Sequence, residues 1–146
     1  SGTEYWCAAL GFWPGTPFLM PLDPRCRLTA PKYNPPRTFT PRGTIGMGGG
    51  ASAIYPVDGP GGYQIFARTP VPIWDARQRL PQFESQRWLL QPTDRLKFVP
   101  CSVEEFDEIE RKVDEGTYEM NITGYQRVSL NRYKAWAEQL DTTKRF

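Results

Sequence analysis

The sequence predicts a mainly β protein: a β-barrel followed by a C-terminal helix–strand–helix extension. In a chain of 146 residues, 13 glycines and 15 prolines separate short apolar runs, and short strands divided by such turns are typical of barrels. After residue 101 the pattern changes to helical periodicity. We therefore expect a barrel over residues 1–100 and an extension over residues 101–146 that packs on it.

The barrel strands are expected where apolar runs lie between turns. The first run spans residues 5–10 and ends at Gly11. Prolines are dense between residues 11 and 43, which excludes a helix interior and favours an extended path with tight turns. Further strands are expected at residues 44–47, 52–55, 64–68, 71–74 and 95–99.

The first helix of the extension is predicted by its cap. Ser102 and Glu105 form a capping box, in which the Ser102 side chain accepts from a helical amide and the Glu105 side chain reaches back. Gly116 is placed to end the helix. The apolar residues at helical spacing are Val103, Phe106, Ile109 and Val113.

A strand and a second helix are expected next. Tyr118, Met120 and Ile122 alternate with polar residues, which predicts a half-buried strand. Ser129 is placed to cap the second helix. The expected apolar stripe of that helix consists of Leu130, Tyr133, Trp136 or Ala137, and Leu140.

Composition excludes several classes of function. Histidine is absent, which removes imidazole bases and the commonest metal ligand from this chain. The net charge of +2 is spread along the chain, so neither a nucleic-acid nor a membrane partner is expected. The three cysteines, Cys7, Cys26 and Cys101, cannot close into a complete disulfide set. We therefore expect reduced thiols and a cytoplasmic protein.

Other motifs give little chemistry. The glycines of residues 46–50 are not followed by Lys-Ser or Lys-Thr, so a tight turn is favoured over a phosphate loop. The acidic residues of 107–115 lack the spacing of a calcium loop, and no metal is expected. Arg68 ends an apolar strand before Thr69-Pro70, where it is either a bidentate donor at the barrel rim or a salt bridge that clamps a loop.

Five blocks in a fixed order resemble one known family. They are Gly11-Phe12-Trp13-Pro14-Gly15-Thr16-Pro17-Phe18-Leu19, Arg42-Gly43-Thr44-Ile45-Gly46, Ala53-Ile54-Tyr55-Pro56, the run of residues 59–70 and the run of residues 91–100. Together they resemble the carboxyltransferase-domain family of allophanate hydrolase, 5-oxoprolinase and urea carboxylase. The resemblance implies a cyclophilin-like barrel, preceded in the family by a smaller α/β subdomain that this chain lacks. Residues 102–140 look more like the extension of urea carboxylase.

The resemblance also implies a pocket, although it identifies no catalytic residue. The candidates for a substrate or partner pocket are Phe12, Pro14, Ser52, Tyr55, Arg68 and Thr69. The sequence departs from the family pattern at three positions. Ala51 stands where the family usually has Gln, Thr16 where it has Phe, and Lys32 where it has Arg.

The favoured function is the cyclophilin-like part of a carboxyltransferase or ATP-dependent amidase system acting on urea or a related small amide. Arg68 would be the electrostatic donor and Tyr55 a hydroxyl donor. No cofactor is expected on this chain itself, and biotin and ATP would be held by the rest of a parent enzyme. Its partners would be the missing N-terminal subdomain and a companion carboxyltransferase subunit or domain.

Two alternatives stay open from the sequence. One is a non-catalytic binding or regulatory module that docks a partner protein, which the replacement at Ala51 favours. The other is a peptidyl-prolyl isomerase, which follows only from likeness to the cyclophilin fold and is tested by a peptide isomerisation assay.

Overall fold

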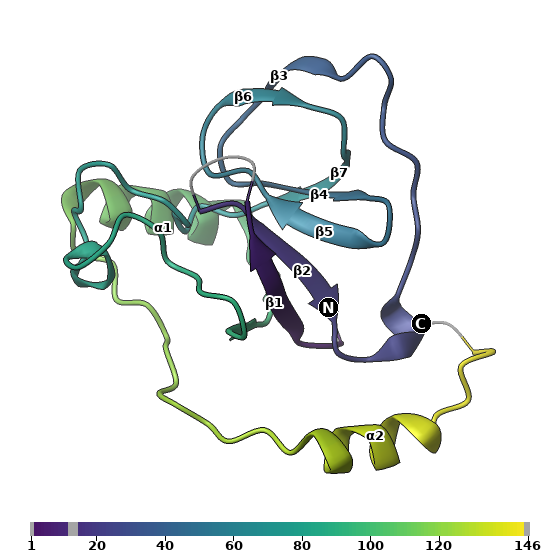
Figure 1. Cartoon of the computed structure of the whole chain (residues 1–146). Coiled ribbons are helices and arrows are strands. Elements are labelled where there is room, and N and C mark those ends of the chain that lie inside the picture. The colour runs from purple at the N-terminus through teal and green to yellow at the C-terminus, as the bar shows by residue number, and fades with distance from the viewer. Residues whose placement is uncertain (1, 12–14, 145–146) are drawn as a thin grey trace.

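Short strands in the first hundred residues form an antiparallel sheet and a separate ribbon (Figure 1). The computed structural model describes residues 2–11 and 15–144. The sheet has the strand order β7-β4-β5-β2-β1-β8, and β3 pairs with β6 in the ribbon. The strands are β1 (Tyr5–Leu10), β2 (Pro17–Pro21), β3 (Arg37–Thr40), β4 (Thr44–Gly48), β5 (Ala51–Ile54), β6 (Gly59–Gly61), β7 (Gln64–Arg68) and β8 (Arg95–Leu96).

The mainly β class is confirmed, and the sheet is open. Strands β7 and β8 lie at its two edges and do not pair with each other in the described part of the chain, so the hydrogen bonding does not close into a barrel. The strand predicted at 71–74 is wrong, because Pro72 lacks an amide donor and only an isolated bridge between Trp74 and Trp88 forms there. The strand predicted at 95–99 shortens to β8, which pairs only with Tyr5 and Trp6 of β1.

Sequence reasoning missed β2 inside the proline-rich segment. Its prolines stand at the two ends, Pro17 and Pro21, so the interior of the strand keeps its amide donors. Strand β2 pairs with β1 on one side and with β5 on the other, which places it in the middle of the sheet. Leu19 of β2 is fully buried, and this burial stabilises the fold by about 2 kcal/mol.

Two hydrophobic clusters hold the fold together. The larger one lies on the sheet and contains Cys7, Leu19, Ile45, Ile54, Ile73 and Leu90. The smaller one joins Leu80 and Phe83, at the 3₁₀ turn Pro81–Phe83, to Val113 of helix α1 (Val103–Glu115). The second cluster thereby fixes α1 beside the loop that follows β7.

Helix α1 begins and ends as predicted. The Ser102 side chain accepts from the Glu105 amide at 3.2 Å, and the Glu105 carboxylate accepts from the Ser102 amide at 2.8 Å. Gly116 has a φ of 73°, the left-handed conformation that suits glycine at a helix C-terminus.

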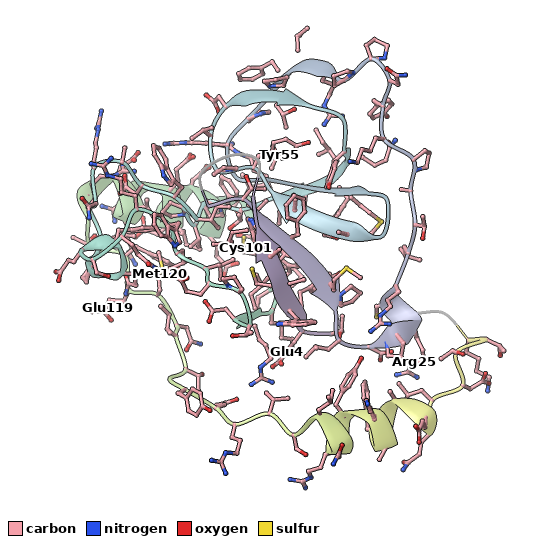
Figure 2. The ribbon with its side chains drawn as sticks, viewed as in Figure 1. Glu4, Arg25, Tyr55, Cys101, Glu119 and Met120 are labelled. Atoms are coloured by element: carbon pink, nitrogen blue, oxygen red, sulfur yellow. The ribbon has the colours of Figure 1, made fainter. Side chains whose placement is uncertain are left out.

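The strand predicted between the two helices is wrong. Residues 117–129 are irregular, because no strand of the described chain lies beside them to pair with their backbone. The alternation has another cause: Tyr118 and Met120 pack against the smaller cluster, whereas Glu119 between them is exposed (Figure 2).

Helix α2 (Leu130–Glu138) lies apart from the sheet at the end of this segment (Figure 1). Ser129 caps it as predicted, and its side chain accepts from the Arg132 amide at 3.3 Å. The Tyr133 hydroxyl donates to the Leu22 carbonyl at 2.9 Å and accepts from Arg27 at 3.1 Å, which ties α2 to the segment after β2. Neither described helix has the length and apolar character to span a membrane.

Candidate functional site

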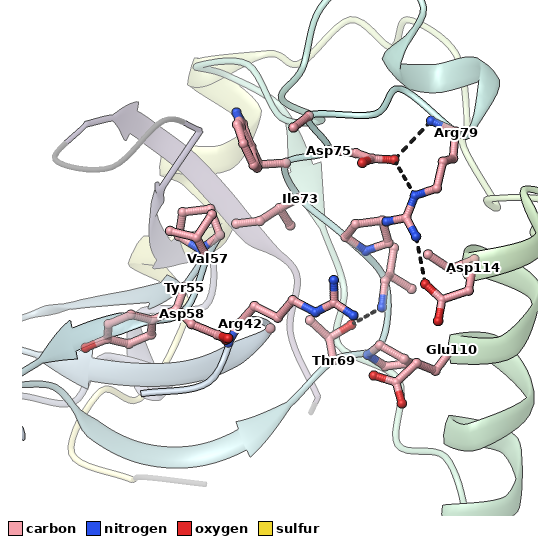
Figure 3. Close-up of a pocket in the computed structure, with 18 of the residues that line it drawn as sticks. Arg42, Tyr55, Val57, Asp58, Thr69, Ile73, Asp75, Arg79, Glu110 and Asp114 are labelled. Carbon is pink, nitrogen blue, oxygen red and sulfur yellow. Dashed lines mark hydrogen bonds and ion pairs between the residues drawn. The ribbon is translucent and has the colours of Figure 1, made fainter. Parts of the chain in front are cut away.

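A charged hollow lies between the loops at the β4 and β7 edge of the sheet and helix α1 (Figure 3). Its volume is about 410 Å³. We call it the polar cleft. Its charged and hydroxyl-bearing lining residues are Arg42, Tyr55, Asp58, Arg68, Thr69, Asp75, Arg77, Arg79, Glu110 and Asp114.

The floor of the polar cleft is set by Gly43. Its amide donates to the Tyr55 carbonyl at 2.8 Å, and its carbonyl accepts from the Thr69 amide at 2.9 Å. The φ of Gly43 is 75°, and a Cβ at this position would collide with the Thr69 carbonyl. Only glycine therefore lets these backbones approach so closely. The Thr69 hydroxyl accepts from the Val71 amide at 3.2 Å and turns the chain toward the next wall.

Arg68 joins the sheet to helix α1. Its Nη2 lies 3.3 Å from Oε1 of Glu110, and its guanidinium lies 5.3 Å from the centre of the Phe106 ring. Its Nε donates to the Arg42 carbonyl at 3.3 Å. Because these contacts use most of its donors, Arg68 acts mainly as the clamp, the second of the two roles that the sequence allowed.

A buried carboxylate organises the opposite wall. Asp75 is 4% exposed and accepts from the Arg77 and Arg79 amides, both at 3.0 Å, and from the Arg79 Nε at 3.1 Å. The Arg79 Nη1 lies 2.7 Å from the Asp114 carboxylate on α1. Burial alone would raise the pKa of Asp75, but the hydrogen bonds from Arg79 and Arg77 outweigh it, and the pKa is lowered. This wall is therefore charged, paired and rigid.

Arg42 presents its guanidinium to the cleft. Its side chain extends toward the middle of the hollow in Figure 3 and makes no ion pair with the described residues. Its backbone amide donates to Oδ1 of Asp58 at 2.7 Å, which fixes the turn on which it stands. The polar cleft therefore offers a cation at Arg42 and a carboxylate at Asp58, next to each other.

A second hollow lies between the sheet and the β3–β6 ribbon. Its volume is about 320 Å³. We call it the apolar pocket, and its lining residues are Thr16, Phe18, Lys32, Tyr33, Pro36, Ala53, Ile54, Tyr55, Pro60, Gly61, Gly62 and Tyr63. Tyr55 is 8% exposed and lines both hollows. Its hydroxyl accepts from the Tyr63 amide at 3.4 Å, so it points toward the ribbon and away from Arg42 (Figure 3).

The structure brings three of the six candidate residues together. Tyr55, Arg68 and Thr69 line the polar cleft. Ser52 is 2% exposed, lies in β5 between β2 and β4, and is absent from the described lining of both hollows. The other two, Phe12 and Pro14, lie outside the described residues.

Sequence reasoning missed several residues of these hollows as site candidates. Arg42 and Asp58 belong to the turns on either side of β4 and β5, and a charge beside a glycine in a turn is a weak signal by itself. Asp75 and Arg79 stand four residues apart, but they lie in a polar stretch where neither helix nor strand is expected. Thr16 drew attention only as a departure from the family pattern.

The described residues offer no evident site for a metal or a nucleotide. Across residues 2–11 and 15–144, no three His, Cys, Asp or Glu side chains come together as a metal site would require. Gly46 and Gly48 lie in strand β4, where an added Cβ would contact Tyr63, so these glycines serve close packing. Their segment does not fit a nucleotide phosphate.

The fold and the polar cleft, with its arginines and carboxylates at one sheet edge, define a class that comparison with known proteins identifies. The family model described as carboxyltransferase domain, subdomain C and D, matches residues 1–83. The chain belongs to this family.

Two curated proteins and one solved structure illustrate the similarity. Urea amidolyase of Saccharomyces cerevisiae is 44% identical over 108 residues, which cover 74% of this chain and 6% of that protein. A 5-oxoprolinase subunit of Bacillus subtilis is 34% identical over 103 residues, covering 70% of this chain and 40% of that protein. The crystal structure of the K. lactis urea amidolyase superposes with a TM-score of 0.85 at 35% identity, over 94% of this chain and 8% of that one.

The coverage of these matches separates the two parts of the chain. The chain spans only a small part of the urea amidolyases it matches and less than half of the 5-oxoprolinase subunit. The structural match covers 94% of the chain and therefore reaches into the C-terminal extension. The extension, like the sheet, thus has a counterpart in the urea amidolyase.

Proposed function

We propose that this chain is the cyclophilin-like part of a carboxyltransferase or ATP-dependent amidase system that acts on urea or a related small amide. The names of its relatives support the substrate class, since they include urea amidolyase, urea carboxylase and 5-oxoprolinase. The observation that carries the proposal is the polar cleft, whose described lining holds four arginines and four carboxylates. A neutral, strongly dipolar molecule suits such balanced charge.

The cleft has the groups that a urea-like molecule requires. Such a molecule has a carbonyl oxygen that accepts hydrogen bonds and N–H groups that donate them. The Arg42 guanidinium would donate to the carbonyl oxygen, and the Asp58 carboxylate would accept from an N–H group. Fixed donors aimed at a carbonyl oxygen stabilise the charge that develops there during transfer of a carboxyl group. Arg42 thus takes the donor role that was expected of Arg68.

The remaining candidates support this arrangement from behind. Arg68 holds α1 against the sheet, and Thr69 fixes the loop that follows β7. Tyr55 contributes its backbone to the cleft, since its hydroxyl is bonded to the Tyr63 amide. We assign positioning roles to these residues.

Cofactors and partners belong to the parent protein in this proposal. No described segment of the chain fits ATP, so ATP and biotin would be held elsewhere, and biotin would supply the carboxyl group. The partners are an N-terminal subdomain and a companion carboxyltransferase subunit or domain. The division of the chain at residue 100 is part of the same proposal. The three free thiols of Cys7, Cys26 and Cys101 support a cytoplasmic location.

The alternative is a docking module without catalysis. One observation favours it: the edge strand β7 exposes Ile65 and Phe66 by 47% and 54%. Exposed apolar side chains on a sheet edge are typical of an interaction surface. The substitution Ala51→Gln separates the two, because a gain of turnover in the full-length protein supports an enzyme and unchanged background turnover supports the docking module.

The direct test is a substrate panel with the full-length protein that carries this sequence. Urea, allophanate and 5-oxoproline are each supplied with ATP and bicarbonate, and amide-dependent ATP hydrolysis is measured. Turnover with one of them supports the proposal and names the substrate. Background hydrolysis with all three contradicts it and leaves the docking module.

A further inference from the structure

The apolar pocket has the form of a binding site for a small molecule. Phe18, Ala53 and Ile54 form the wall on the main sheet, and Tyr63 lies on the opposite wall. Gly61 adds no side chain, and a Cβ there would collide with the Tyr55 hydroxyl. The volume of about 320 Å³ lies at the small end of the range for ligand pockets.

One polar group in this pocket is left without a partner. Thr16 is 7% exposed, and its Oγ1 has no hydrogen-bond partner in the structure. A buried hydroxyl without a partner loses its hydrogen bonds to water and gains none in return. A ligand with a polar group next to Thr16 would supply the missing bond.

The charges around the pocket are positive. The Lys32 Nζ lies 5.2 Å from the centre of the Tyr63 ring, and Lys32 forms no ion pair with any described residue. Arg37 lies opposite Gly61 in the β3–β6 register and stacks at 5.4 Å on the ring of Tyr33, which lines the pocket. Its Nε and Nη2 are buried without a hydrogen-bond partner. The described lining contains no acidic residue, so an anion is favoured here.

From this geometry we infer that the apolar pocket binds a small apolar carboxylate, whose apolar body contacts Phe18 and Ile54 and whose carboxylate faces Lys32 and the Thr16 hydroxyl. Burial raises the pKa of the Tyr63 hydroxyl, which agrees with a wall largely removed from water. The inference does not rest on the proposed function, because Arg42 and Asp58 of the polar cleft do not line this pocket.

The test is a titration of the ¹⁵N-labelled 146-residue chain followed by NMR, with phenylacetate as the probe and phenylacetamide as its uncharged counterpart. We expect saturable shifts of the Ala53, Gly61 and Gly62 amides with a dissociation constant of about 1 mM, as suits a probe of this size. Phenylacetamide should bind about tenfold more weakly, because it lacks the charge that pairs with Lys32.

Two variants locate the carboxylate. Lys32→Gln should weaken phenylacetate about fivefold and leave phenylacetamide unchanged, since it removes only the charge. Thr16→Val keeps the shape and removes the hydroxyl, and it should weaken both probes. Lys97→Gln, beside β8 at the far edge of the sheet, is the matched control and should change neither.

Three results would overturn the inference. The first is no saturable shift up to about 20 mM phenylacetate. The second is equal affinity for the acid and the amide in the unsubstituted chain. The third is a set of shifts at Thr69 and Val71 of the polar cleft in place of those at Ala53 and Gly61. The surface position of Lys32 keeps the test decisive even if Thr16→Val fails to fold.

Discussion

The polar cleft and the apolar pocket lie on the two sides of Tyr55 and solve opposite problems. In the polar cleft, charged groups are numerous and most are paired with one another, as Asp75 is with Arg79 and Arg68 with Glu110. In the apolar pocket, charges are few, and the Thr16 hydroxyl has no partner. Paired charges make a rigid, nearly neutral frame, whereas an unpaired buried group makes a site that a ligand completes.

This difference teaches where function is to be sought in each hollow. In the polar cleft, the groups to test are those that the ion pairs leave over, above all the Arg42 guanidinium. In the apolar pocket, the group to test is the buried one without a partner. The following substitutions break the comparison in order of decreasing effect on stability.

The largest effect is expected from Asp75→Ala. This change removes the acceptor of two backbone amides and the partner of Arg79, whose charge then faces a partly dry wall. We expect a loss of about 3 kcal/mol in the free energy of unfolding, measured by urea denaturation. Asp58→Ala, at an exposed hydrogen bond to the Arg42 amide, is the control and should lose less than about 1 kcal/mol. Equal losses in the two variants would show that the buried network contributes nothing special.

A smaller loss is expected from Gly61→Ala, which acts on the wall that both hollows share. The added Cβ would lie 2.6 Å from Cε1 and 2.7 Å from Cζ of Tyr55, so the ring must shift. Such overpacking costs about 2 kcal/mol. Gly50→Ala is the matched control, because a Cβ there meets nothing within 4 Å, and its stability should change by less than about 0.5 kcal/mol. Thermal unfolding of both variants checks this, and a G61A melting temperature equal to that of G50A would contradict the close contact.

The pH dependence of stability should distinguish the two walls. The pKa of Asp75 is lower in the folded chain than in the unfolded one, so its contribution is present above about pH 4 and is lost as the pH falls through the folded value. The stability difference between the unsubstituted chain and Asp75→Ala should therefore shrink by about 1 kcal/mol between pH 7 and about pH 3. Denaturation curves at the two pH values give this difference, and a constant difference would mean that hydrogen bonding without charge accounts for the wall.

The smallest effect on stability is expected from Arg42→Gln. The Arg42 side chain is exposed and makes no ion pair in the described part of the chain, so the free energy of unfolding should change by less than about 0.5 kcal/mol. Urea denaturation at neutral pH checks this. A loss above about 1 kcal/mol would show that the guanidinium has a structural partner and is not available to a ligand.

The sequence predicted well those features that depend on local chemistry. The capping box at Ser102, the end of α1 at Gly116 and the cap of α2 at Ser129 each depend on a few neighbouring residues. Strands β1 and β7 followed from apolar runs between turns. These signals are short-range, and the structure confirms each of them.

Features that depend on distant parts of the chain were missed or predicted incorrectly. The alternation of Tyr118 and Met120 is real, but whether it becomes a strand depends on a neighbouring strand that sequence periodicity cannot supply. Arg68 was correctly placed near a hollow, yet its use as a clamp depends on Glu110, 42 residues away. The apolar pocket could not be predicted, because it forms only when the ribbon folds over β5.

The measurement that tests the central claim most directly is the kcat/KM of the full-length protein for its amide substrate, compared between Arg42→Gln and the exposed control Arg127→Gln. If Arg42 polarises the amide carbonyl in the polar cleft, R42Q should lower kcat/KM by about 100-fold, and R127Q should change it by less than about twofold. Equal values of kcat/KM in the two variants would contradict the claim that the polar cleft binds the amide.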